Sequence, residues 1–191
     1  LCNLSRLDYD PTTATFTLAG FNDICHLDGA LPFILSGGTR ILLIRQGQTA
    51  WNLRAGEERF RGRTDLTLDA VGRAQAVAVA RRLRGETIEA VYSSSLLRTQ
   101  QTAQPLVEGS SHAGLGLRCH AGLLDIDYGG FQGVTHSQAA TSYPDLYSLW
   151  RNAPGQVFFP GGEGLLDVQK RTGALLEELS ARHPGQTVAL V

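Results

Sequence analysis

Three short apolar runs have the length and composition of β-strands that are buried on both faces. They are residues 41–44, residues 88–92, where Glu89 is the one charged residue, and residues 187–191, which begin with a threonine. Largely apolar runs of this kind are typical of parallel sheets that are covered by helices on both sides. We therefore predict three strands of such a sheet.

Between these runs, apolar residues recur every three or four positions, which is the spacing of an amphipathic helix. This pattern predicts a helix over residues 68–83 with Thr67 as its N-cap, a second from residue 96 to Pro105, and a third from residue 165 to His183. Strands that alternate with helices predict an α/β fold, a three-layer α/β/α sandwich with a mostly parallel sheet.

Two further segments flank this pattern. Residues 1–28 alternate in polarity around the turn residues Asp10 and Pro11, which predicts a β-hairpin before the sandwich. The run Ser-Gly-Gly-Thr at residues 36–39 indicates a linker, so we predict a domain boundary between residues 36 and 37. Residues 134–158, which contain three large aromatic residues, are expected to form a helical cap; residues 109–122 show no interpretable pattern.

Polar residues directly follow two of the predicted strands. Arg45 follows residue 44, and Arg98 comes six residues after residue 92. Ligands bind beyond the carboxyl ends of parallel strands, and guanidinium groups hold phosphate oxygens in a bidentate geometry. Asn52 adds a side-chain donor, and Gly47 is expected to let backbone N–H groups approach an anion. Arg59 and Arg61 are further candidate phosphate ligands.

Five motifs occur together and in order, at residues 41–52, 59–65, 91–103, 124–133 and 159–163. The first is an apolar strand followed by Arg-Gln-Gly-Gln-Thr-Ala-Trp-Asn, and the last is Phe-Pro-Gly-Gly-Glu. Together they resemble the motifs of the histidine phosphatase (phosphoglycerate mutase-like) superfamily. The resemblance extends over about residues 39–191.

This resemblance implies a role for several residues. Members of the superfamily transfer a phosphoryl group through a phosphohistidine, held by two arginines and a second histidine that follows the strand matching residues 187–191. By resemblance, Arg45 and Arg98 are phosphate ligands, Asn52 is a supporting donor and Asp125 is the general acid. The expected ligand is inorganic phosphate or a phosphorylated small molecule, with no cofactor and no metal.

The chain departs from the motif at the position of the nucleophile, where Gln46 replaces histidine. A carboxamide has no basic lone pair and cannot form a phosphoryl-enzyme intermediate. We therefore predict a phosphate-binding pseudophosphatase, in which Arg61 replaces the usual glutamine and adds a positive charge. Two alternatives remain. The protein is an active phosphatase or mutase, if Gln46 is a sequence error or if the activity lies in a neighbouring copy. Otherwise it is a structural domain without a ligand.

Residues 1–28 also resemble the closing hairpin of the superfamily, although there the hairpin comes last. We predict that residues 1–36 are the closing hairpin of an upstream copy plus a linker, and that residues 37–191 are a truncated histidine phosphatase-like domain. A circular permutation and an unrelated hairpin are the alternatives. The chain contains no methionine, which favours a piece of a longer tandem protein.

Composition narrows the remaining classes of function. A net charge of −1 does not fit a strongly basic nucleic-acid-binding protein, and no apolar run reaches the ~18 residues of a membrane span. The three cysteines show no Cys-x-x-Cys spacing, which favours a reducing, cytoplasmic location. The histidines show no metal-ligand spacing, and His136 is the one that could approach the predicted site. The pattern predicts neither the substrate nor the oligomeric state.

Overall fold

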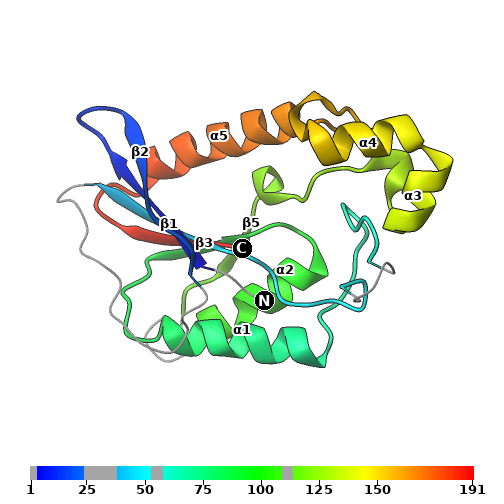
Figure 1. The fold of residues 1–191 in the computed structure, drawn as a ribbon. Helices are drawn as coiled ribbons and strands as arrows, with labels where there is room; N and C mark the ends of the chain where they lie inside the picture. The colour runs from blue at the N-terminus through cyan, green and yellow to red at the C-terminus, as the bar shows by residue number, and fades with distance from the viewer. Residues whose placement is uncertain (1–3, 24–37, 53–57, 109–113) are drawn as a thin grey trace.

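The computed structural model describes residues 4–23, 38–52, 58–108 and 114–191. Its centre is a six-stranded mixed sheet in the order β2-β1-β3-β6-β4-β5. The strands are β1 Leu4–Asp10, β2 Thr15–Asp23, β3 Thr39–Ile44, β4 Ala90–Ser93, β5 Leu117–Cys119 and β6 Thr187–Leu190; the helices are α1 Ala70–Arg82, α2 Leu97–Glu108, α3 His136–Ser142, α4 Pro144–Asn152 and α5 Leu165–Arg182. Helices α1 and α2 cover one face of the sheet and α5 covers the other, which confirms the predicted α/β fold (Figure 1).

The apolar strands are buried because both faces of the sheet are covered. Strands β3, β6, β4 and β5 run parallel to one another. Along β3, Leu42 packs with α1 and α2, whereas the neighbouring Ile41 packs with α5. Successive side chains of a strand point to opposite faces, so a strand between two layers of helices needs apolar residues at every position.

The N-terminal hairpin forms as predicted and lies at the edge of this same sheet. Strand β1 pairs with β2 and also with β3, and both pairs are antiparallel. In the pair of β1 with β3, Leu4 lies opposite Ile44 and Tyr9 lies opposite Thr39. The first two residues of the predicted linker, 36 and 37, lie outside the described part of the chain, whereas its last residue, Thr39, is the first residue of β3. The origin of the hairpin, in an upstream copy or by permutation, stays a prediction.

The structure corrects several local predictions. The N-cap of α1 is Asp69 and not Thr67, because the Asp69 carboxylate accepts the Gly72 N–H. Helix α2 continues past Pro105 to Glu108, since burial of the following Leu106 and Val107 offsets the hydrogen bond that proline cannot make. Strand β5 was not predicted, because its three residues are partly exposed at a sheet edge and carry no apolar run.

Candidate active site

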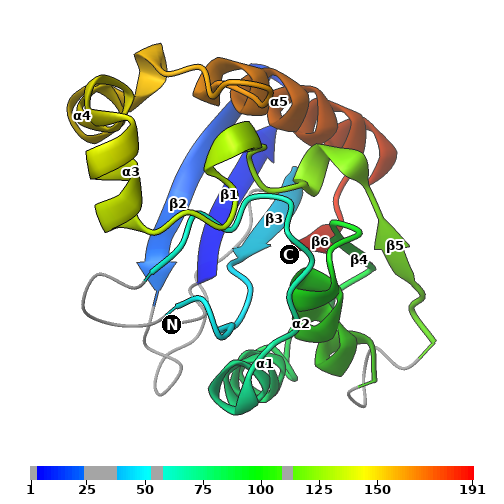
Figure 2. The same cartoon turned by 90° about the vertical axis from the view of Figure 1, so that its right-hand side faces the viewer.

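A cavity of about 1180 Å³ opens at the carboxyl ends of the parallel strands. Figure 2 faces the edge of the sheet at which the parallel strands end. In this view the cap helices α3 and α4 lie above the strand ends, and α1 and α2 lie below them. The side chains that the sequence assigned to catalysis or phosphate binding line this cavity: Arg45, Gln46, Asn52, Arg59, Arg61, Arg98 and Asp125. The cap helices lie within residues 134–158, as expected.

The loop after β3 is held by side chains of α1 and α2. Thr102 accepts the Gly47 N–H at 3.0 Å, and Gln75 accepts the Gln48 N–H at 2.9 Å. The Gln48 side chain in turn donates to the N-cap residue Asp69. These backbone donors are therefore already paired, and the expectation that Gly47 presents N–H groups to an anion is wrong.

Glycine is required in this loop because two backbones approach closely. A Cβ at Gly47 would lie 2.5 Å from the Gly72 carbonyl oxygen, and a Cβ at Gly72 would lie 2.7 Å from the Gln48 nitrogen. Helix α1 therefore packs directly against the chain that carries Arg45 and Gln46.

We expect Gly72→Ala to destabilise the protein by about 2 kcal/mol, because the added methyl group must displace the loop backbone. Urea unfolding measures this change. Gly173 is the matched control: it is also helical, but a Cβ there meets no atom within 4 Å. Gly173→Ala is expected to stabilise the protein by about 0.5 kcal/mol, because alanine favours the helix. Equal effects of the two substitutions would contradict the close approach.

Asn52 is oriented by a short turn. Its side-chain oxygen accepts the N–H of Thr49 at 2.9 Å and the Thr49 hydroxyl at 3.2 Å. With the oxygen held in this way, the Asn52 amide nitrogen is left to donate into the cavity that this residue lines.

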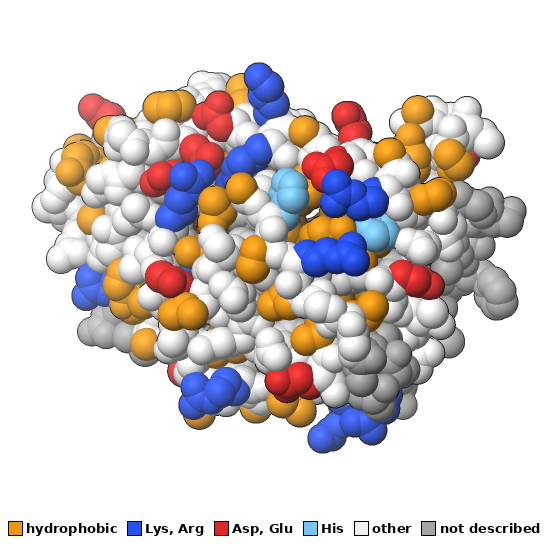
Figure 3. Space-filling model, turned by 180° about the vertical axis from the view of Figure 1, so that it is seen from behind, with side chains coloured by type: hydrophobic (Ala, Val, Ile, Leu, Met, Phe, Trp, Pro, Cys, Tyr) orange, Lys and Arg blue, Asp and Glu red, His pale blue; other side chains and the backbone are white. Residues whose placement is uncertain are grey.

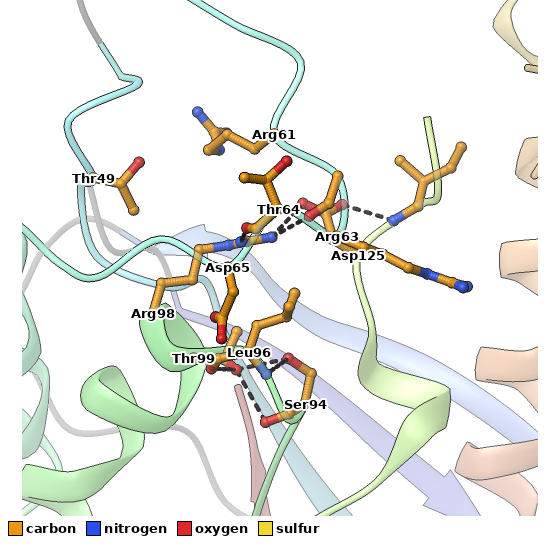
Figure 4. A network of polar contacts seen from close by, with 12 residues as sticks. Thr49, Arg61, Arg63, Thr64, Asp65, Ser94, Leu96, Arg98, Thr99 and Asp125 are labelled. Atoms are coloured by element: carbon orange, nitrogen blue, oxygen red, sulfur yellow. Dashed lines mark hydrogen bonds and ion pairs between the residues drawn. The ribbon is translucent and has the colours of Figure 1, made fainter. Parts of the chain in front are cut away.

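Arg98 is the most buried charged group of the site, at 0% exposure. Its guanidinium donates to the carbonyl oxygens of Gly62 at 2.6 Å and Thr64 at 2.8 Å and pairs with Asp125 at 3.1 Å (Figure 4). Its Nε has no hydrogen-bond partner among the described residues. Burial lowers the pKa of Arg98 most, and the nearby charge of Arg61 lowers it further, against the opposing effect of Asp125.

Two more arginines line the cavity on the segment before Gly62. Arg61 is only 13% exposed, and the described part of the chain offers its Nε no partner; Glu58 lies 3.4 Å from another of its nitrogens. Arg59 donates to the Gly133 carbonyl at 2.7 Å and lies over the Trp51 ring. Arg98, which is buried, and Arg61, which is partly exposed, are thus two like charges at one cavity, an arrangement that favours a bound anion.

Three charged residues that the sequence did not assign to the site hold the segment carrying Asp125. Arg171 of α5 donates to the carbonyl oxygens of Gly122 and Asp125 and to the Glu163 carboxylate. Arg63 also pairs with Glu163, at 2.7 Å. Burial raises the pKa of Glu163, but the hydrogen bonds and positive charges around it outweigh burial and hold that pKa below its usual value. Glu163 lies in the last sequence motif, and this was the one signal that could have indicated the network.

Five rings form one side of the cavity, here called the aromatic wall: Phe60, Tyr128, His136, Tyr147 and Trp150. Phe60 is at its centre, 4.7 Å from the His136 ring and 5.0 Å from the Trp150 ring. Burial, with the charge of Asp125, raises the pKa of Tyr128 to about 12, so its phenol stays protonated at neutral pH. The sequence indicated His136 as a residue that could approach the site and placed Tyr147 and Trp150 in the expected cap; Phe60 and Tyr128 were missed.

Other kinds of site find no support in the described residues. Within them, no group of three or more His, Cys, Asp or Glu side chains could hold a metal ion. Among their helices none has the length and apolarity needed to cross a membrane. On the face shown in Figure 3, acidic and basic side chains are interspersed and form no extended basic surface.

Comparison with known proteins identifies the family. Residues 41–191 match the model of the histidine phosphatase superfamily (branch 1). This match covers most of the chain, so the protein belongs to that superfamily, as its motifs indicated.

Several characterised relatives share this part of the chain. Phosphoserine phosphatase 1 of Hydrogenobacter thermophilus is 32% identical over 80% of this chain and 69% of its own length. Glucosyl-3-phosphoglycerate phosphatase of Mycobacterium tuberculosis is 35% identical over 76% of this chain and 62% of its own length. A solved structure of the mycobacterial enzyme has a TM-score of 0.68 and 33% identity over 78% of this chain and 71% of its own. The chain thus spans about two thirds of these relatives.

The structure of Bacillus stearothermophilus YhfR is similar as well. It has a TM-score of 0.74 and 29% identity, and the match covers 80% of this chain and 73% of YhfR. Both solved structures agree with the sandwich found here.

Proposed function

We propose that this domain binds the phosphate group of a phosphorylated small molecule between Arg45, Arg98, Arg61 and Asn52. The observation that carries the proposal is Arg98, fully buried at the cavity with an Nε that no described residue accepts. A buried guanidinium donor without a partner is costly, and a phosphate oxygen is its best acceptor. Arg61 supplies a second buried donor of the same kind.

We further propose that the bound phosphoryl group is not transferred to the protein. Gln46 lines the cavity, and by resemblance of the motif it stands where the family has its nucleophile. Its carboxamide cannot attack phosphorus. Asp125, which by resemblance would protonate the leaving group, remains 3.1 Å from Arg98. The site therefore combines phosphate-binding groups with a side chain that prevents covalent catalysis, as expected for a pseudophosphatase.

The relatives support a phosphorylated small molecule as the ligand. Their names specify phosphoserine and glucosyl-3-phosphoglycerate as substrates, and the mycobacterial enzyme has been solved in complex with inorganic phosphate. For this chain, the residues that line the rest of the cavity would select between such molecules.

Urea unfolding with and without inorganic phosphate tests the proposal. A ligand at 100 times its Kd stabilises the native state by about 2.7 kcal/mol, and we expect a gain of this size that saturates with phosphate. Arg45→Ala should abolish the gain. Arg81→Ala, on the exposed face of α1, should retain it and serves as the control for charge.

Two results would contradict the proposal. No stabilisation by phosphate, at an ionic strength matched with chloride, would favour a structural domain without a ligand. Steady hydrolysis of a phosphomonoester by the unsubstituted chain would favour an active phosphatase, despite Gln46.

A further inference from the structure

The cavity is much larger than a phosphate group requires. Its volume of about 1180 Å³ exceeds the ~300–1,000 Å³ typical of sites for small organic ligands. Arginines, Asn52 and the aromatic wall of Phe60, Tyr128, His136, Tyr147 and Trp150 all line this one cavity. A ligand whose phosphate meets the arginines therefore has these rings within the same cavity for its remaining atoms.

The rings of the wall are packed against one another and leave part of their surface to the cavity. Trp150 lies 5.8 Å from the Tyr147 ring and 5.4 Å from the His136 ring, with tilted planes. All three side chains are only half-buried, whereas Phe60 behind them is 3% exposed. The wall is thus a supported apolar surface that an additional ring can cover.

The charges beside the wall restrict what can bind there. Arg59 and Arg151 both line the cavity, and Glu58, an acidic residue of the same lining, is paired with Arg61. Aromatic walls can also bind quaternary ammonium groups, but two arginines beside the rings disfavour a cation.

We propose that the aromatic wall is a subsite for the alcohol part of the ligand, and that the ligand is a phosphate monoester of a ring-bearing alcohol that carries no positive charge. This inference rests on the proposed phosphate site. An aryl group and the apolar face of a sugar can both pack against the rings of Trp150 and Tyr147. The experiment below distinguishes these two kinds of ligand.

Isothermal titration of the unsubstituted chain compares four esters that carry the same phosphate: methyl phosphate, phenyl phosphate, glucose 6-phosphate and phosphocholine. We expect one or both ring esters to bind about tenfold more tightly than methyl phosphate, and phosphocholine to gain nothing. The identity of the ester that gains distinguishes an aryl from a sugar ligand. Equal affinity for the methyl and ring esters, or a gain with phosphocholine alone, would overturn the subsite and leave the phosphate site standing. No binding of any ester would overturn both.

Substitutions locate the effect on the wall. Trp150→Ala should reduce the ratio of ring-ester to methyl-ester affinity to about one, and Trp150→Phe, which keeps a ring, should retain part of it. Phe158 is the control, because it is 61% exposed and does not line the cavity. Phe158→Ala should leave the ratio unchanged; if it lowers the ratio as much as Trp150→Ala, the wall is not the subsite. If Trp150→Ala does not fold, the comparison of esters on the unsubstituted chain still decides.

Discussion

Replacing Gln46 by histidine is expected to give the domain a phosphoryl-enzyme intermediate. Gln46 already lines the cavity beside Arg45, so an imidazole there reaches the space occupied by the proposed phosphate. A histidine nitrogen carries the basic lone pair that a carboxamide lacks, and losing a nucleophile typically costs several orders of magnitude in rate. We expect nitrophenol release from p-nitrophenyl phosphate to rise on the order of 10³-fold, with one phosphoryl group detected on the protein by intact mass.

The control for this experiment is Gln46→Asn, which changes the length of the side chain but keeps the amide. It should give neither nitrophenol nor a phosphorylated protein. If the unsubstituted chain releases nitrophenol as fast as Gln46→His, the residue is not what limits transfer, and the pseudophosphatase assignment is wrong.

Removing Arg98 is expected to have the largest effect on stability. Arg98→Ala leaves the carbonyl oxygens of Gly62 and Thr64 and the Asp125 carboxylate without their donor. Leaving buried acceptors unpaired and deleting one partner of a buried ion pair together predict a loss of about 3 kcal/mol. Because the Asp125 side chain is 35% exposed, water replaces part of its ion pair with Arg98, which limits the expected loss of stability. Urea unfolding at neutral pH measures the loss.

Two further variants separate charge from geometry. Arg98→Lys keeps the positive charge but lacks the planar guanidinium group with its several donors. Compared with Arg98→Ala, it should therefore recover only part of the stability and little of the phosphate binding. Arg81→Ala, on the surface of α1, should change the free energy of unfolding by less than about 0.5 kcal/mol. A loss below 1 kcal/mol for Arg98→Ala would contradict the structural role of its three bonds.

The sequence by itself determined the layers of the fold and the family. Residues 41–44 and 188–191 are apolar at every position, and such runs are typical of strands with helices on both faces. The predicted strands placed Arg45 and Arg98 at one edge of the sheet because parallel strands end at the same edge, and the resemblance added Asp125. The proposal that Gln46 prevents phosphoryl transfer to the protein needed no coordinates, since it rests on the type of residue at that position.

The tertiary structure alone decided how these residues are held and what else faces the cavity. Thr102 and Gln75 accept the backbone donors that seemed free for an anion, and both come from helices distant in sequence. Phe60, on a loop, and Trp150, in α4, are 90 residues apart in numbering and meet at 5.0 Å only when the cap folds over the sheet. Periodicity detects which face of an element is apolar, but not which distant element covers it; contacts between remote segments depend on the packing of the whole chain.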